Sequence, residues 1–198
     1  NEQNVLVTEM AGRASIELKG LELGYDLSDS PAIVTRVVEQ VKELESQGWS
    51  FEAADASFEL LILDSQGTEV SFEVESWRTI VEQDAEGTVR TEATVKIHID
   101  GERIISTAEG NGPVNALDRA MRRAIVQAYP DLDTLRLVDY KVRILDEKGG
   151  TGAKTRVLIG TTDGQDSWST VGVHENVIAA SWRALEDAVK FGLLRRGQ

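Results

Sequence analysis

The sequence predicts an α+β fold in which an N-terminal helical segment precedes two copies of a βββα unit. The chain up to residue 66 places apolar residues at helical spacing, whereas the chain from residue 69 onward shows the alternating runs that are typical of strands. Sliding the sequence along itself by about 63 residues brings landmarks of this second part into register. We therefore expect a helical linker subdomain over residues 1–66 and a second domain over residues 67–198, with repeat units of about 67–130 and 131–198.

The linker subdomain should contain three helices. Two short helices are expected between Val5 and Gln47, and Pro31 suits the first turn of the second one. The apolar stripe of that second helix ends at Gly48. A third helix is expected over residues 53–61.

Each repeat unit reads as three strands followed by a helix. The expected ranges are 70–82, 90–99, 103–108 and 113–128 in the first unit, and 134–146, 154–162, 166–171 and 175–191 in the second. The landmark pairs are Trp77-Arg78 with Tyr140-Lys141, Gly87-Thr88 with Gly150-Thr151, Asp100-Gly101 with Asp163-Gly164, and Ser106-Thr107 with Ser169-Thr170. Asp-Gly between alternating runs is a strong hairpin signal, so the strands should pair antiparallel. One helix covers only one face of a sheet, so the two units of a chain should pack together. Two chains should then form a homodimer, because four units bury more surface than two.

Composition excludes several classes of partner. The net charge is −13, from 34 acidic against 21 basic residues, so nucleic acid and anionic membranes are unsuitable partners. The chain contains no cysteine, no apolar run of the roughly 20 residues that a membrane span needs, and no signal segment. A cytoplasmic location fits these features. The chain starts at Asn1 without a methionine, so we expect it to be a fragment of a longer protein.

The stretch "STAEGNGPVNALDRAMRRAI", residues 106–125, raises the possibility of a nucleotide site. Gly110 and Gly112 lack the third glycine of a dinucleotide fingerprint, and an antiparallel unit is the wrong context for one. The second copy has Glu175 where a phosphate loop would not accept an acid. A second stretch, "GGTGAKT" at 149–155, has Ala153 before Lys154, which departs from a P-loop and indicates a hairpin turn.

Two helix N-termini remain, each preceded by a glycine turn and built from small residues. Free N–H groups there attract a carboxylate, and nearby apolar side chains leave a recess for a short branched group. This pattern suits a small amino acid. The alternative is that the glycines only turn the chain and the alanines only let the helices approach their sheets closely.

Catalysis has little support in the residues. His98 lies on the polar side of an alternating strand, and His174 precedes a helix that it could cap. The two histidines have no metal-ligand spacing, so we expect no metal or other cofactor in this chain.

Several stretches together resemble the C-terminal portion of the 2-isopropylmalate and citramalate synthases. They are "GRASIELKGLELG", "VKELESQGWSFEAADASFELL", "SWRTIVE", "EATVKIHIDGERIISTAEGNGPVNALDRA", "LVDYKVRILD" and "STVGVHENVIAASWRAL". The resemblance covers nearly the whole chain, and "GNGPVNA" is its most specific motif. It implies an allosteric, dimer-forming domain of duplicated βββα units that binds a branched-chain amino acid and inhibits a TIM barrel. That barrel, with its divalent metal and acetyl-CoA as substrate, has no counterpart here.

The stretches "SFEAADASFELL" and "ESWRTIVE" are more similar to the citramalate synthase branch, whose effector is isoleucine, than to the leucine-regulated branch. Mapped onto this chain, the effector region of the family implies Gly110, Asn111, Gly112, Pro113, Val114, Ala116, Gly172, Val173, His174, Asn176, Ile178 and Ala179. Three functions stay open at this point: an effector-binding domain with isoleucine or leucine, a purely structural dimerisation module, and an enzyme in its own right.

Overall fold

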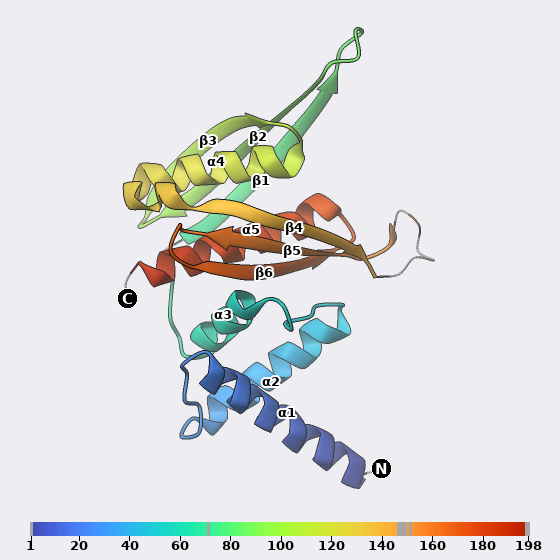
Figure 1. Ribbon diagram of the computed structural model, residues 1–198, viewed down its shortest axis with the longest axis vertical. Coiled ribbons are helices and arrows are strands. Elements are labelled where there is room, and N and C mark those ends of the chain that lie inside the picture. Colours follow the sequence, from blue (N-terminus) through green and yellow to red (C-terminus); the bar gives the residue numbers. More distant parts are fainter. Residues whose placement is uncertain (1, 71, 146–149, 151, 197–198) are drawn as a thin grey trace.

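The computed structural model describes residues 2–70, 72–145, 150 and 152–196, with side chains from Gly12 onward. Three helices form one end of the molecule, and two three-stranded sheets, each with a helix, form the rest (Figure 1). The α+β class and the duplicated βββα unit are therefore confirmed. Within the described ranges no helix has both the length and the apolar content needed to cross a membrane.

The N-terminal part contains α1 (Glu2–Glu22), α2 (Pro31–Ser46) and α3 (Asp55–Ser65). Pro31 occupies the first turn of α2, where its missing N–H costs nothing, and Val34, Val37 and Val38 of the expected apolar stripe are buried. The third helix begins two residues later than expected and continues to Ser65, after which Gly67 adopts a φ of 78°. Such left-handed backbone is the usual way to end a helix.

The first repeat unit consists of β1 (Phe72–Gln83), β2 (Val89–Ile99), β3 (Glu102–Gly110) and α4 (Pro113–Ala128). The sheet order is β1-β2-β3, with antiparallel pairing throughout. At the predicted Asp-Gly turn, Asp100 and Gly101 both adopt positive φ, which matches the twist of the two strands they join. Three fully buried alanines of α4 allow it to lie close to the sheet: Ala116, Ala120 and Ala124.

The second unit follows a short 3-10 helix, η1 (Pro130–Thr134), and consists of β4 (Arg136–Ile144), β5 (Thr155–Thr162), β6 (Ser167–His174) and α5 (Val177–Arg195). Its sheet order, β4-β5-β6, repeats that of the first unit. Parts of the "GGTGAKT" stretch and of the Gly150-Thr151 landmark lie outside the described residues.

The two repeat units are not related by one constant offset of about 63 residues, as the sequence comparison predicted. The N-cap residues Gly112 and Asn176 are 64 positions apart, so Ser106 corresponds to Thr170 and the predicted pairing of Ser106-Thr107 with Ser169-Thr170 is wrong. The extra residue lies between the first two strands of the second unit. Ser76 pairs with Lys96, 20 positions further on, whereas Asp139, the equivalent of Ser76, pairs with Gly160, 21 positions further on.

The two units share one hydrophobic core. The rings of Trp77 in β1 and Trp182 in α5 stack with centroids 5.7 Å apart. Within the second unit, Tyr140 in β4 and Ser181 in α5 form a hydrogen bond of 2.9 Å. Figure 1 shows α4 and α5 running in the same direction, so that their N-terminal ends lie on the same side of the molecule.

The helical part is joined to the second unit. Val171 of β6 belongs to the same buried cluster as Val34 and Phe58 of the N-terminal helices. Arg156 of β5 donates from Nε to the carbonyl oxygen of Gly48 at 2.7 Å, just beyond the end of α2, where a cation is favoured by the helix dipole. Because this core is shared, the division at residues 66 and 67 stays a prediction.

Gly172 tests how closely α5 is held against its sheet. A methyl group on Gly172 would lie 2.0 Å from the carbonyl oxygen of Ala180 and 2.9 Å from the amide nitrogen of Ala184. We expect Gly172→Ala to lower the free energy of unfolding by about 3 kcal/mol, because backbone atoms of α5 must move. Gly112→Ala is the matched control: a methyl group there meets nothing within 4 Å, so its effect should stay within about 0.5 kcal/mol. Urea denaturation followed by tryptophan fluorescence measures both, and equal stability of the two variants would contradict the close packing.

Candidate functional site

The predicted site residues lie at two equivalent strand-to-helix turns. Gly172, however, lies within β6, so the expectation that a glycine turn precedes the second helix is wrong. Gly110 ends β3 and Gly112 precedes α4, while His174 ends β6 and Asn176 precedes α5. Val114 and Ile178 occupy equivalent positions in the first turns of the helices, and both are partly buried against the shared core. Ala116 and Val173 are buried, so they contribute to the floor of the turns rather than to their surface.

The N-terminus of α4 carries no side-chain cap among the described residues. Gly112 has extended backbone with a φ of −174°, and its neighbour Pro113 has no N–H to donate. Asn115 does not cap the helix either, because its Oδ1 accepts a hydrogen bond from the amide of Asn111 at 3.1 Å, which closes the turn. The first turn of α4 therefore offers the N–H groups of Val114 and Asn115 to an anion.

The N-terminus of α5 is different. The Oδ1 atom of Asn176 accepts hydrogen bonds from the amides of Ile178 at 2.9 Å and Ala179 at 3.1 Å. The Nδ1 atom of His174 in turn accepts from the amide of Asn176 at 2.9 Å. The expectation that both helices offer free N–H groups is thus wrong for α5, because its own N-cap asparagine occupies them.

Close packing against the helices requires glycine at two of the predicted positions. A methyl group on Gly110 would lie 2.5 Å from the amide nitrogen of Ala116, and Gly172 is similarly closed by α5. The packing alternative therefore explains Gly110 and Gly172. It does not explain Gly112, which has open space around it and backbone that any residue can adopt.

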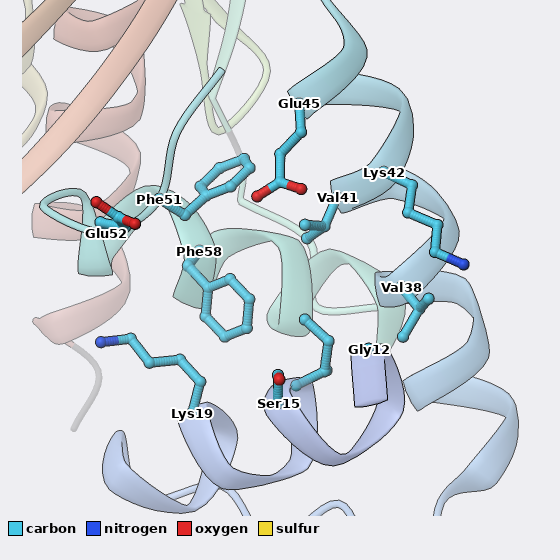
Figure 2. A pocket seen from close by; sticks show the side chains of 11 residues that line it. Gly12, Ser15, Lys19, Val38, Val41, Lys42, Glu45, Phe51, Glu52 and Phe58 are labelled. Atoms are coloured by element: carbon cyan, nitrogen blue, oxygen red, sulfur yellow. The ribbon is translucent and has the colours of Figure 1, made fainter. Parts of the chain in front are cut away.

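Five pockets stand out in the described part of the chain, and none contains any of the twelve predicted residues. The largest, of about 730 Å³, lies among α1, α2 and α3 (Figure 2). Sequence analysis did not predict this pocket. Apolar residues at helical spacing predict that the helices pack together, but they do not show whether a cavity remains between them. Two small residues of α1 that line it, Gly12 and Ser15, were the available signal.

The outer strands expose a second kind of surface. Along β4 the apolar side chains that remain exposed are Val138, Tyr140, Val142 and Ile144, and in β1 they are Ile80 and Val81. Exposed apolar residues along an edge strand invite pairing or packing with another chain. These two strands are the surface through which a second copy could be bound.

One half-buried carboxyl group, that of Asp187, connects the helical part to α5. Ser57 of α3 donates to Asp187 Oδ2 at 2.7 Å, and the same hydroxyl oxygen accepts a hydrogen bond from the amide of Val171 at 3.1 Å. Burial disfavours the charged carboxylate and raises the pKa of Asp187 to about 6, and the hydrogen bond from Ser57 opposes this shift. The contact therefore joins α3, β6 and α5 through a single hydroxyl group.

No group of three or more histidine, aspartate or glutamate side chains in the described chain could hold a metal ion. His98 instead lies 3.4 Å from a carboxylate oxygen of Glu75, which Arg103 also contacts. The expectation that the chain holds no cofactor stays a prediction.

The fold defines a duplicated βββα module with exposed apolar residues on its outer strands β1 and β4. Residues 52–193 match the family model described as the LeuA allosteric (dimerisation) domain, and the chain belongs to this family. The resemblance noted from the sequence is thereby confirmed.

The similar curated proteins are mainly citramalate synthases. The chain is 60% identical over 199 residues to the (R)-citramalate synthase of Streptomyces coelicolor, an alignment that covers 100% of the chain and 37% of that protein. It is 42% identical to the enzyme of the same name from Aquifex aeolicus, with 98% and 37% covered. A 2-isopropylmalate synthase from Solidesulfovibrio magneticus is more distant, at 28% identity with 93% and 33% covered. The predicted closeness to the citramalate synthase branch is confirmed, and the chain spans about 37% of the length of its first relatives.

The raised pKa of Asp187 predicts how stability depends on pH. The folded state takes up a proton near pH 6, whereas an unfolded aspartate does so near pH 4, so ionised Asp187 destabilises the fold above pH 6 and the penalty disappears as pH falls towards 4. Asp187→Asn keeps an acceptor for Ser57 without the charge. We expect it to raise the free energy of unfolding by roughly 2 kcal/mol at pH 8 and to change it little at pH 4.5.

Urea denaturation at the two pH values measures this difference. Asp64→Asn, at an exposed carboxylate of α3, is the control and should change stability by less than about 0.5 kcal/mol at pH 8. Equal effects of Asp187→Asn at both pH values would contradict the desolvated carboxylate.

Proposed function

We propose that this chain is the allosteric regulatory and dimerisation domain of an (R)-citramalate synthase and that it binds a branched-chain amino acid, with isoleucine favoured. The uncapped N-terminus of α4, beside the partly buried Val114, carries this proposal. Its support is the family of the chain, which is described as allosteric, and the synthase names of its relatives.

The carboxylate of the effector would bind at α4 rather than at α5. The N–H groups of Val114 and Asn115 are uncapped, whereas Asn176 already occupies those of Ile178 and Ala179. A helix N-terminus favours an anion by about 0.3–1 kcal/mol when exposed and up to about 2 kcal/mol when partly buried. The α5 turn would then contribute its apolar surface at Ile178.

The branched side chain of the effector would lie against Val114, Ile178 and Ala179, with the buried Ala116 and Val173 beneath. Apolar burial contributes about 0.8 kcal/mol per CH₂ group, so isoleucine should exceed valine by only a modest factor. Leucine has the same size as isoleucine and must be rejected by shape.

A homodimer is the second part of the proposal. Both turns lie on the same side of the molecule (Figure 1), and the apolar outer strands β1 and β4 leave surface that a second copy can cover. A dimer would also reduce the solvent exposure of the turns and strengthen their electrostatic interaction with a ligand.

The remaining parts of the proposal concern the longer polypeptide. The relatives are nearly three times as long as this chain, so we propose that a catalytic barrel, using acetyl-CoA and a divalent metal, belongs to the same polypeptide. The net charge of −13 keeps nucleic acid and anionic membranes unfavourable as partners. A cytoplasmic location stays a prediction.

A purely structural dimerisation module is the alternative that specific observations favour. Packing explains Gly110 and Gly172, and α5 caps itself. This alternative predicts that no amino acid changes the stability of the chain. A leucine-regulated domain is the other alternative, and a parallel titration with leucine distinguishes it.

Gly112 provides the test of effector binding. Gly112→Asp places a carboxylate and a β-carbon beside the uncapped N–H groups, so we expect it to fold and dimerise but to bind isoleucine at least tenfold more weakly in isothermal titration. Gly112→Ala adds a methyl group where nothing lies within 4 Å and should bind within about twofold of the parent. If Gly112→Asp binds as tightly as the parent, the site lies elsewhere; if the parent binds no amino acid, the structural module is correct.

The outer strand β4 provides the test of assembly. The parent should have twice the mass of the 21.7 kDa chain in light scattering at tens of micromolar. Replacing both Val142 and Ile144 with lysine puts two charges into the exposed apolar strand and should produce a monomer. Ile105→Lys, at an equally exposed position of β3, is the control and should remain dimeric. A monomeric parent, or a dimeric double variant, would contradict this interface.

A further inference from the structure

We propose that the pocket among α1, α2 and α3 is a second ligand site, which takes a small hydrophobic amine. It is separate from the glycine turns, so this proposal does not depend on the proposed effector site. The pocket measures about 730 Å³, within the range of about 300–1,000 Å³ that small-molecule sites occupy.

The walls of the pocket are apolar and aromatic. Phe51 and Phe58 line it from the α3 side, and their rings meet edge to face with centroids 6.2 Å apart. Trp49 stacks behind Phe51 at 6.3 Å. Val38 and Val41 of α2 form the opposite wall (Figure 2). Such a lining accepts a compact apolar body, and its aromatic faces also attract a cation.

The charges around the opening favour a cation over an anion. Figure 2 shows the carboxylate of Glu45 directed towards the pocket, whereas the ammonium groups of Lys19 and Lys42 point away from it. Lys19 is held by Asp55, with 2.7 Å between Nζ and Oδ1. The net charge of −13 adds a long-range attraction for positive ligands.

Close packing of α1 does not require the glycine at position 12 that leaves space for this pocket. Gly12 lies within a 21-residue helix, where glycine costs about 1 kcal/mol relative to alanine. A methyl group on Gly12 would meet only Val38 Cγ1, at an ordinary 3.9 Å. A larger residue would therefore be accommodated and would fill the pocket, so the glycine keeps the pocket open.

Three probes with the same body and different heads test the proposal: phenethylamine, 3-phenylpropanoate and 2-phenylethanol. In isothermal titration of the 198-residue chain at pH 7 we expect phenethylamine to bind at least tenfold more tightly than 3-phenylpropanoate, with the alcohol between them. Glu45→Gln should weaken binding of the amine by about threefold and leave the alcohol unchanged. Glu39→Gln, on another face of α2, is the matched control and should leave both unchanged.

Two variants fill the pocket. Gly12→Phe and, independently, Val41→Trp should abolish binding of phenethylamine while the circular dichroism spectrum stays that of the parent. Using both keeps the test valid if one of them fails to fold. Binding of none of the three probes, tighter binding of the carboxylate, an unchanged Glu45→Gln affinity, or undiminished binding to a folded pocket-filling variant would each overturn the proposal.

Discussion

The close approach of each helix to its own sheet is the constraint on which the rest of the structure depends. In the second unit Gly172 lies directly beneath Ala180 and Ala184, and no larger residue fits there without moving the backbone of α5. In the first unit a methyl group on Gly110 would lie 2.5 Å from the amide nitrogen of Ala116. These contacts fix where each helix begins and how its first turn faces the preceding strand. They therefore position both strand-to-helix turns before any ligand is considered.

The two βββα units differ in the outer faces of their sheets, and this difference determines how each face is used. In the second sheet Arg156 and Val171 hold the helical part, through the end of α2 and through the core around Phe58. The positions of the first sheet that correspond to Leu158 and Val171 of this core are Thr94 and Thr107, which hydrogen-bond each other at 3.1 Å and give that face a polar character. These contacts attach the helical part to the second unit, where the hydroxyl group of Ser57 in α3 accepts a hydrogen bond from the amide of Val171 in β6.

Much of this architecture could be predicted from the sequence because it depends on local signals. Alternating runs and the Asp-Gly turn located the strands to within a few residues, and alanine spacing located both helices. The drift in the repeat was missed because one extra residue between β4 and β5 changes the offset by a single position, which leaves the Ser-Thr pairs of the two units in apparent register. The cap by Asn176 was a recognisable local signal that was not weighed, whereas the pocket beneath Gly12 depends on how three helices pack, which periodicity does not report.

We propose that an amino acid binds at the uncapped start of α4 and that the turn before α5 completes its site. Hydrogen–deuterium exchange of the 198-residue chain, with and without saturating isoleucine, tests it most directly because it locates binding along the sequence. The account predicts slowed exchange at residues 110–116 and 172–179. Unchanged exchange in both turns, or slowed exchange confined to α1, α2 and α3, would contradict it.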